Sequence, residues 1–451
     1  MITSIKNLVL GYEKKLFSPT EITEWYLKRI RNLDSEIHSY ITITEETALQ
    51  QAKKAEAKMN AGIVGRLLGV PISYKDSIDT KGILTTNGSR VDAKRVPNKN
   101  ADIVSVLEQE GTILLGKNNM YEYGAGIDSK NPYFGDIVNP WNPKKTAGGS
   151  SSGSAVAIAT NLSLASIGTD TSGSIRVPAS CCGVIGIKPT KKLMSMKGMM
   201  PLSWTLDHAG IITSNIEDTA IILQTLYGIH YSKDFSPELV GVRIGIPSDY
   251  FNENIDNKVK TMYEKAIQQM VELGATLVEV NTSFLEDVVS VSRTIGTSEM
   301  GIVHQESYST NSHLYSEEMI KTFKKGHAIS SFDYLNALQR KSEWSYKVSE
   351  LFSLVDVIVT PTMPIVTPDS DAKEEVFENE SIGDCMVRFT NIFNITGHPA
   401  LSLPTSDKIE GTPFGLQIIA DYHREDQLLN VGYAYEQYAL NSLYADRQFL
   451  F

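Results

Sequence analysis

Residues 146–190 read TAGGSSSGSAVAIATNLSLASIGTDTSGSIRVPASCCGVIGIKPT and carry most of the information about this chain. In order, they give a Gly/Ser-rich bend, an apolar run typical of a buried helix, and a second Gly/Ser turn. Glycine has no Cβ atom, so the backbone at both turns can approach another group closely. The pattern indicates two turns that present serine side chains at a functional site.

Outside this stretch, short apolar runs alternate with helical segments. GVPISY (69–74) and TILLG (112–116) read as buried strands, and ADIVSVLEQEG between them reads as a helix. Strand character returns in VGVRIGIP (240–247), VDVIVTPTMP (355–364) and HPALSLP (398–404). Alternating strands and helices predict an α/β fold.

Two helical regions accompany this pattern. Residues 1–61 alternate apolar and charged positions at helical spacing, and Ser18-Pro19-Thr20-Glu21 predicts a helix start because proline is favoured in the first turn. A second helical tract spans about 256–350, and the acidic, polar residues 367–384 predict an exposed loop. A length of 451 residues would by itself suggest two domains. Because no linker or internal repeat is evident, we predict one domain over 1–451.

Composition excludes several classes of protein. With 41% hydrophobic and 21% charged residues, the chain is typical of a globular protein. Its net charge of −11 argues against a nucleic-acid-binding surface, since phosphate contacts need clustered Lys and Arg. No apolar run approaches the roughly 20 residues that span a bilayer. Three cysteines are too few for a disulfide framework and the N-terminus lacks a signal-peptide pattern, so we expect a cytoplasmic protein.

Three motifs also admit simpler interpretations. GGSSSGS alone is typical of a flexible linker, but here it continues directly into the apolar run SAVAIAT and a second turn follows. Residues 149–153 also satisfy the G-x-S-x-G pattern of α/β-hydrolases, but NPWNPKKTA before them reads as a loop instead of the required strand. GTILLGK (111–117) resembles a phosphate loop, but Asn118 stands where Ser or Thr is required. A buried strand is favoured there.

Histidine and cysteine spacing gives no metal site. None of the eight histidines shares a metal-ligand spacing with another histidine or a cysteine. We expect His208 and His398 to be packing or pocket-wall residues, and the adjacent Cys181 and Cys182 to be buried, inert thiols. No metal or cofactor is expected.

The two turns, together with GVPISYKD at 69–76, resemble the amidase signature hydrolases. The hallmark of that family is G-G-S-S-G-G-S followed by G-T-D-x-G-G-S-I-R-x-P-A, with a catalytic lysine in an apolar strand ending in K-D. The intervals match too: Lys75 precedes Ser150 by 75 residues (150−75=75), and Ser150 precedes Ser174 by 24 (174−150=24). Further similar segments are PLSWTLDHAG (201–210), FNITGHPALSLP (393–404) and PFGLQIIA (413–420), so the resemblance covers nearly the whole chain.

This resemblance implies a fold and a catalytic relay. It implies a large mixed β-sheet covered by helices on both faces, with the variable helical region at about 256–350 contributing to the substrate pocket. It implies that Ser174 is the nucleophile and that Ser150 passes its proton to a neutral Lys75. It also implies a cis peptide bond between Gly149 and Ser150.

A lysine acts as a base only when it is unprotonated, whereas its ordinary pKa is about 10.4. Burial lowers the pKa of a lysine. Lys75 follows the apolar run GVPISY and does not lie on a charged helix face, so the sequence favours burial. Asp76 would point to the opposite side of a strand, and its adjacency therefore predicts no ion pair with Lys75.

The resemblance also assigns roles to neighbouring residues. It implies that the backbone N–H groups of Thr171, Ser172 and Gly173 form the oxyanion hole. Three residues are expected to brace the two turns: Ser151, Asp170 and Arg176. The sequence departs from the family pattern at Ser152 and Ser172, where glycine is usual. The backbone of Ser172 must therefore adopt angles that a non-glycine residue tolerates.

We therefore expect an amidohydrolase that cleaves a small-molecule carboxamide through an acyl-enzyme on Ser174, without direct nucleic-acid binding or membrane attachment, and compatible with a homodimer. Because all three residues of the relay are present, a non-catalytic scaffold is disfavoured. An alternative in the same family is the A subunit of the tRNA-dependent glutamine amidotransferase, which frees ammonia from glutamine for a partner protein. PLSWTLDHAG resembles the stand-alone amidases more, and the region before FNITGHP lacks an acidic residue expected for glutamine recognition. We favour the stand-alone amidase.

Overall fold

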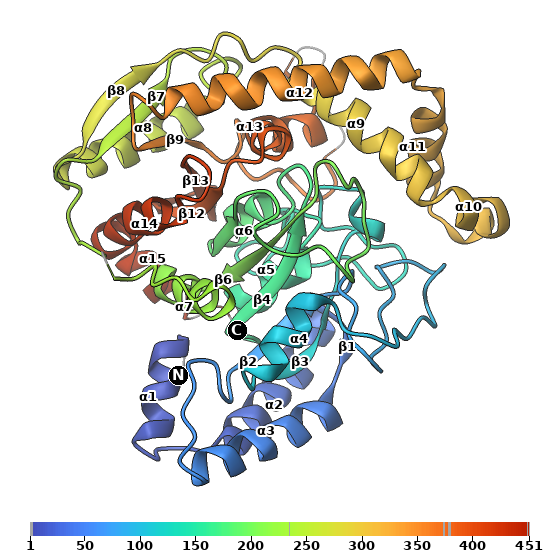
Figure 1. The fold of residues 1–451 in the computed structure, drawn as a ribbon, viewed down its shortest axis with the longest axis vertical. Coiled ribbons are helices and arrows are strands. Elements are labelled where there is room, and N and C mark those ends of the chain that lie inside the picture. Colours follow the sequence, from blue (N-terminus) through green and yellow to red (C-terminus); the bar gives the residue numbers. More distant parts are fainter. Residues whose placement is uncertain (1–2, 234, 373–374, 378–379, 449, 451) are drawn as a thin grey trace.

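A large mixed sheet runs through the protein, whose computed structural model describes residues 3–233, 235–372, 375–377, 380–448 and 450 (Figure 1). The strands of this sheet are β1 (Tyr40–Ile43), β2 (Pro71–Lys75), β3 (Ile113–Asn118), β4 (Ala165–Asp170), β5 (Ile185–Lys188), β6 (His208–Thr213), β7 (Arg243–Pro247), β8 (Thr276–Val280), β9 (Val357–Pro361), β12 (Ala400–Ile409) and β13 (Thr412–Ile419). A separate pair is formed by β10 (Glu375–Phe377) and β11 (Glu380–Ser381).

Helices make up most of the remaining structure. They are α1 (Ile5–Glu13), α2 (Pro19–Ile37), α3 (Glu45–Asn60), α4 (Asp102–Gln109), α5 (Ser152–Ala159), α6 (Arg176–Cys182), α7 (Ile216–Tyr227), α8 (Asn257–Glu272), α9 (Val288–Val303), α10 (Gln305–Asn311), α11 (Glu317–Ala328), α12 (Ser331–Leu351), α13 (Ile382–Thr396), α14 (Glu425–Ala439) and α15 (Asn441–Arg447). Two short 3₁₀ turns are η1 (Glu122–Gly124) and η2 (Ser312–Leu314).

Among the described residues, the large sheet has eleven strands in the order β1-β3-β2-β4-β6-β5-β12-β13-β9-β7-β8. Strand β2 pairs in parallel with both β3 and β4, and β7 pairs in parallel with β8 and β9, whereas the pairs from β4 through β9 are antiparallel. The sheet is therefore mixed, as the family resemblance implies. Because β2 and β4 run in the same direction, their carboxyl ends meet at one edge of the sheet.

Helices cover both faces of this sheet. Helix α6 packs against β5, β12 and β13 and contacts α5 and α13, whereas α14 packs against β12 and β13 with α7 and α8 beside it. The two groups of helices lie on opposite sides of the strands in Figure 1. All eight residues of α5 are buried, because this helix lies against strands and against α6. The predicted α/β architecture is confirmed.

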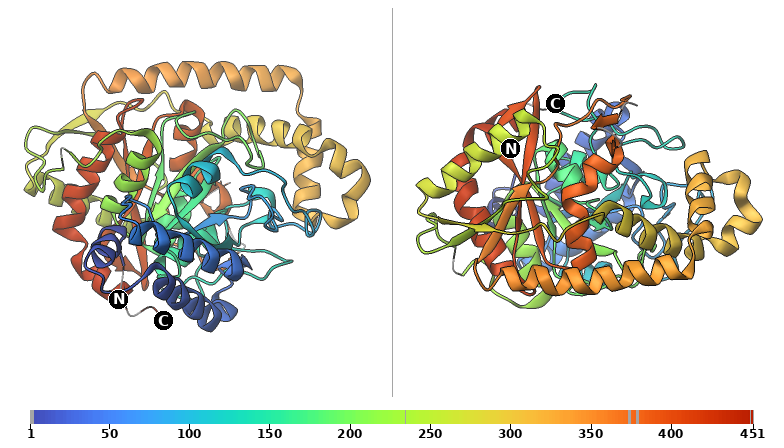
Figure 2. Two further views of the ribbon diagram at one scale, coloured as in Figure 1. Left: turned by 60° about the horizontal axis from the view of Figure 1, so that its bottom comes forward. Right: turned by 90° about the horizontal axis from the view of Figure 1, so that it is seen from above.

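The predicted helical tract at about 256–350 is interrupted by an edge strand. Helices α8 to α12 occupy most of it, but β8 at Thr276–Val280 pairs in parallel with β7. Its alternation of exposed and partly buried residues is weak, which hides the strand in the sequence. Helices α9 to α12 extend from the sheet, and Figure 2 shows α12 laid along one side of the molecule.

The first 61 residues are mostly helical, with one difference. Ser18 caps α2 through a capping box with Pro19 in the first turn, as predicted. Residues 40–43, however, form β1, which pairs antiparallel with β3 at the sheet edge, so the interpretation of this segment as purely helical is wrong. Residues 1–2 lie outside the described part.

The interpretation of 367–384 as an exposed loop is also wrong in part. Strands β10 and β11 form a short antiparallel pair within it, and α13 begins at Ile382. Residues 373–374 and 378–379 of this segment lie outside the described part of the chain. Within the part described, no helix combines the length and apolar character needed to cross a membrane.

Candidate active site

Lys75 and Ser150 form the centre of the site. Lys75 ends β2, and its Nζ donates a hydrogen bond to Ser150 Oγ at 2.7 Å. The same Nζ donates to Thr169 Oγ1 at 2.9 Å, because Thr169 lies near the carboxyl end of the parallel neighbour β4. Sheet direction thus brings together residues that are 75 or more positions apart in sequence.

Burial dominates the electrostatics of Lys75. Its side chain is fully buried, and this loss of hydration lowers its pKa to about 7, although the charges of Asp170 and Asp207 act to raise it. Asp76 points away from Lys75, as the alternation of a strand predicts, and accepts hydrogen bonds from the N–H and hydroxyl of Thr86. Lys75 can therefore be neutral close to neutral pH.

Ser150 lies in a tightly enclosed bend. The peptide bond between Gly149 and Ser150 is cis, as the resemblance implies. A Cβ atom on Gly149 would lie 2.2 Å from the carbonyl oxygen of Asp128, so only glycine fits there. Gly124 faces the same bend, since a Cβ atom on it would lie 3.4 Å from Ser150 Oγ.

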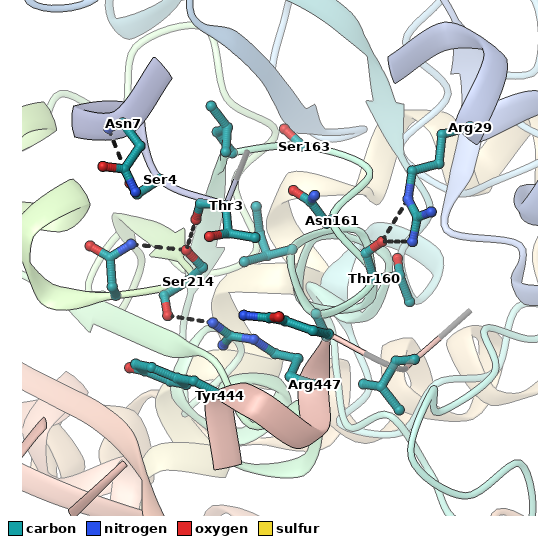
Figure 3. A pocket seen from close by; sticks show the side chains of 16 residues that line it. Thr3, Ser4, Asn7, Arg29, Thr160, Asn161, Ser163, Ser214, Tyr444 and Arg447 are labelled. Atoms are coloured by element: carbon teal, nitrogen blue, oxygen red, sulfur yellow. Dashed lines mark hydrogen bonds between the residues drawn. The ribbon is translucent and has the colours of Figure 1, made fainter. Parts of the chain in front are cut away.

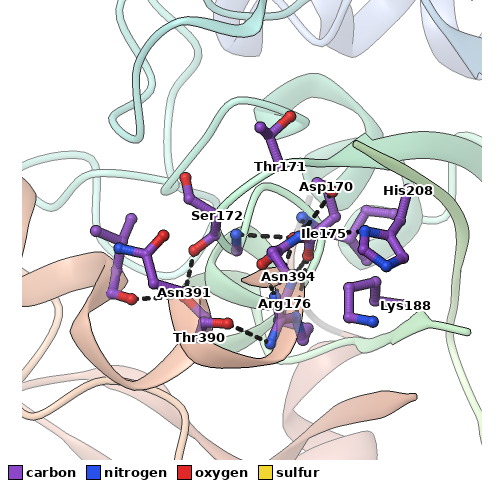
Figure 4. Close-up of polar contacts among 12 residues, drawn as sticks. Asp170, Thr171, Ser172, Ile175, Arg176, Lys188, His208, Thr390, Asn391 and Asn394 are labelled. Atoms are coloured by element: carbon purple, nitrogen blue, oxygen red, sulfur yellow. Dashed lines mark hydrogen bonds and ion pairs between the residues drawn. The ribbon is translucent and has the colours of Figure 1, made fainter. Parts of the chain in front are cut away.

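The second turn is held from behind by a buried ion pair. The carboxylate of Asp170 accepts hydrogen bonds from the Gly173 N–H at 2.8 Å and from Arg176 Nη2 at 3.0 Å (Figure 4). Burial would raise the pKa of Asp170, but the charge and hydrogen bonds of Arg176, with Asn394, lower it to about 2. Arg176 also donates to Gln417 and Asn394, which anchors the turn to β13 and α13.

The backbone N–H of Gly173 helps to brace the turn and does not face the cavity as a free donor. Its φ of 135° suits glycine, and a Cβ atom would lie 2.3 Å from Thr390 Oγ1. Because its N–H donates to Asp170, the structure does not leave it available as an oxyanion donor, so the expectation that all three N–H groups take part is not met. In the described contacts, the N–H groups of Thr171 and Ser172 have no partner. Ser172 does not adopt a positive φ, so serine is tolerated there.

Ser151 and Ser174 join the two turns through the backbone. The Ser151 N–H donates to the Ser174 carbonyl at 3.1 Å, and the Ser151 hydroxyl donates to the Thr169 carbonyl at 3.2 Å. Ser174 is 3% exposed. Within the described residues, no hydrogen bond joins the Ser174 and Ser150 hydroxyls. The structure thus brings Lys75 and Ser150 into direct contact. Among the described residues, it shows no hydrogen bond for the other step of the expected relay, from Ser174 to Ser150.

Sequence reasoning missed three residues of this site. Thr169 contacts Lys75, Asp207 accepts a hydrogen bond from the Thr171 hydroxyl at 2.6 Å, and Asn394 donates to the Asp170 carboxylate at 2.8 Å. Thr169 and Asp207 lie inside the segments GTDTSGS and PLSWTLDHAG, so the same motifs could have pointed to them. Asn394 comes from a helix more than 200 residues away, which no local pattern indicates.

A cavity of about 370 Å³ opens beside the second turn. It is lined by Thr171 and Ser172 together with residues of the loop 121–128 and of α9, α11 and α13. A void of about 10 Å³, close to the size of one water molecule, adjoins Ser150 and shares Gly124 and Thr171 with the cavity. Thr171 and Ser172 thus border the larger cavity and Ser150 borders the small void, whereas neither Lys75 nor Ser174 lines either space.

A second cavity, of about 200 Å³, lies near the two chain ends (Figure 3). Arg29 donates to the Thr160 carbonyl there, and Arg447 donates to the Ser214 carbonyl. None of Lys75, Ser150 and Ser174 lines it. In the part of the chain that the structure describes, no group of three or more His, Cys, Asp or Glu side chains is arranged to hold a metal ion.

The remaining histidines and cysteines named above are buried. His208 Nδ1 lies 2.7 Å from the Leu206 carbonyl, and His398 contacts Ser349 and Thr396. Burial raises the pKa of the Cys181 thiol to about 12, and that of Cys182 well above its ordinary value. Thiols with pKa values this high are unreactive near neutral pH, which agrees with the structural role expected for them.

This mixed α/β fold is shared by solved amidase structures. A family model described as Amidase matches residues 21–429, and the chain therefore belongs to the amidase signature family. A relative from Saccharophagus degradans, named as the A subunit of a glutamyl-tRNA(Gln) amidotransferase, is 33% identical over 476 aligned residues that cover 96% of each chain.

Solved structures of the family share the fold over nearly the whole length. A crystal structure of an amidase is similar with a TM-score of 0.90 and 28% identity, covering 96% of this chain and 99% of the amidase. The crystal structure of the A subunit of the glutamyl-tRNA(Gln) amidotransferase from Thermotoga maritima is similar with a TM-score of 0.82 and 25% identity, covering 96% and 94%. The protein is an amidohydrolase of this family.

Proposed function

We propose that the protein hydrolyses a carboxamide through an acyl-enzyme on Ser174, with Ser150 and Lys75 as its proton relay. The observation that carries this proposal is the 2.7 Å contact between Lys75 Nζ and Ser150 Oγ, at a lysine whose pKa is lowered to about 7. A neutral amine has a lone pair that can accept a hydroxyl proton, whereas an ammonium ion has none. Near neutral pH, much of Lys75 is in the form that can act as a base.

In the first half of the reaction, Ser174 Oγ attacks the amide carbonyl carbon. Its proton passes to Ser150 Oγ, whose own proton passes to Lys75 Nζ. The resulting oxyanion is stabilised by the free backbone N–H groups of Thr171 and Ser172. When the C–N bond breaks, Ser150 returns a proton to the leaving nitrogen and recovers one from Lys75, which yields ammonia or an amine and the acyl-enzyme.

In the second half, water attacks the acyl carbon and gives its proton to the same relay. As the ester bond to Ser174 breaks, the relay returns this proton to Ser174 Oγ, and the carboxylic acid leaves with all three catalytic groups in their starting protonation states. The relay requires the Ser174 hydroxyl to rotate toward Ser150, and such catalytic hydrogen bonds commonly tighten only when substrate is bound. The braced Asp170–Arg176 pair keeps the turn fixed while the side chain moves.

The released ammonia or amine either passes to a partner protein or leaves as a free product, and these two alternatives define two candidate functions. The relatives named as the A subunit of a glutamyl-tRNA(Gln) amidotransferase, one of them 33% identical over 96% of the chain, support a glutaminase that supplies ammonia to partner proteins in a complex. They support this alternative better than the stand-alone amidase that the sequence motifs favour. The stand-alone amidase keeps support from the amidase structure with a TM-score of 0.90. We propose glutamine hydrolysis within such a complex as the first reaction to test.

The deciding experiment measures ammonia released from glutamine and from a panel of aliphatic, aryl and amino-acid amides. The chain is tested alone and after co-expression with the other amidotransferase components. A glutaminase of this kind hydrolyses glutamine faster in the assembly and transfers ammonia to misacylated tRNA. If the chain alone turns over simple amides and the other components neither bind it nor change its rate, the stand-alone amidase is correct.

A further inference from the structure

The cavity beside the second turn has few charged residues. Among its lining residues the charged ones are Asp128, Arg293, Lys325 and Asp384. Arg293 of α9 and Asp384 at the start of α13 form an ion pair with each other. Because their charges cancel, they contribute little net attraction for a charged substrate.

Asp128 places negative charge at the end of the cavity next to the catalytic turns. Its carbonyl oxygen lies against Gly149 and accepts a hydrogen bond from the Ser152 hydroxyl at 3.5 Å. Its carboxylate accepts a hydrogen bond from the Lys130 N–H at 2.9 Å, and this carboxylate is half-buried. An anionic substituent is therefore unfavourable at this end of the cavity.

Lys325 of α11 places a positive charge along the cavity. In the described part of the chain, its ammonium forms neither an ion pair nor a hydrogen bond. The helix that carries it is held firmly, because Phe323 is buried in an aromatic cluster with Tyr315 and a Cβ atom on Gly326 would lie 2.2 Å from the Thr297 carbonyl. Lys325 is thus a solvent-exposed, unpaired cation that lines the cavity from a well-packed helix.

We propose that Lys325 is a specificity-determining residue that binds a carboxylate on the acyl part of the substrate. The inference rests on the proposed amide hydrolysis and narrows its substrates to amides of dicarboxylic or amino acids. The carboxylate pairs with Lys325 at the α11 side, while Asp128 disfavours the reverse orientation. The amide group is then directed to the turn that carries Thr171 and Ser172.

The test compares two amides of the same shape. Glutaramate carries a terminal carboxylate, and 5-methylhexanamide replaces that carboxylate with an uncharged isopropyl group. We expect Lys325→Met to raise KM for glutaramate by up to about fivefold, the upper end for one solvent-exposed ion pair, with kcat unchanged. KM for 5-methylhexanamide should not change. Lys325→Arg should retain the preference for glutaramate, because it keeps the positive charge.

Lys324→Met is the matched control. Lys324 is the neighbouring exposed lysine on α11 and does not line the cavity, so this change removes the same charge from the same helix. It should leave KM for both amides unchanged. Equal effects of Lys325→Met on both amides, or equal effects of the two lysine variants, would overturn the inference.

A binding measurement separates this inference from the proposed chemistry. In a Ser174→Ala background, calorimetry should show glutaramate binding up to about fivefold more weakly after Lys325→Met. If the wild-type protein, both alone and with the other amidotransferase components, releases ammonia from none of the amides in the panel but glutaramate binding still depends on Lys325, the proposed hydrolysis is wrong and the inference stands. If glutaramate fails to bind, or binds independently of Lys325, the inference is wrong whatever the activity.

Discussion

Lys75 Nζ and Ser150 Oγ lie 2.7 Å apart in a site from which solvent is almost wholly excluded. Lys75 ends a strand, and Ser150 follows the cis peptide bond at Gly149 and precedes a helix. This hydrogen bond explains how Lys75 can be buried without a carboxylate in contact with its amine. A hydroxyl partner satisfies its hydrogen-bonding capacity without stabilising its charged form as strongly as a carboxylate would.

Ser174→Ala should abolish amide hydrolysis, with a loss of at least about a thousandfold, because it removes the hydroxyl that we propose forms the acyl-enzyme. Labelling by a fluorophosphonate, detected by mass spectrometry of the intact protein, should disappear with it. Ser172→Ala serves as the control, since its backbone N–H remains, and it should still be labelled. A label mapped to Ser150 or Ser151 in the wild-type protein would contradict the assignment.

Asp170→Asn should destabilise the fold by about 3–5 kcal/mol, because Arg176 would be left as a buried charge without its ionic partner. Both side chains are fully buried in the native structure. The free energy of unfolding is measured by urea denaturation. Glu318→Gln, which breaks the exposed pair with Lys321, is the control and should leave the unfolding midpoint unchanged. Equal stability of the two variants would show that the pair does not brace the turn.

The sequence predicts the parts of this protein whose signals are local. The strand before Lys75, the two Gly/Ser turns and the capped start of α2 each follow from a few adjacent residues, and the structure contains all of them. Strands β1 and β8 escape prediction because each is short and lies at a sheet edge. Their identity as strands depends on pairing with β3 and β7, not on their own pattern.

The bracing of the site is equally invisible in the sequence. Arg176 is adjacent to the second turn, but two of its partners, Asn394 and Gln417, come from α13 and β13. Only the folded sheet brings these elements together. Lys75 and Ser150 lie in contact, and the catalytic roles of Lys75, Ser150 and Ser174 stay predictions.

The pH dependence of kcat/KM should report the protonation of Lys75. Below its pKa of about 7 the lysine is charged and cannot accept a proton, so the rate should fall as pH decreases through about 7 and level off above it. The charge of Asp207 acts to raise this pKa against the larger effect of burial, so Asp207→Asn should shift the acid limb to lower pH even if it slows turnover. An acid limb that stays in place, or moves upward, would exclude Lys75 as the group that titrates.

Lys75→Arg distinguishes a base from a source of positive charge. Arginine remains protonated up to a pH of about 12, so it cannot accept the proton from Ser150, although it preserves the charge and most of the length of lysine. The arginine variant should therefore be nearly as inactive as Lys75→Ala, with the rate of fluorophosphonate labelling of Ser174 reduced to a similar extent.

The control is Lys81→Arg, which changes an exposed lysine and should leave turnover intact. Lys117→Arg would be a poor control, because Lys117 is itself buried beside Asp76. Labelling rates are compared at pH 7 and pH 9, since a proton-accepting lysine gains activity over this interval and an arginine does not. If the arginine variant retains near-wild-type turnover at pH 7, Lys75 supplies charge and not basicity, and the relay has to end on another group.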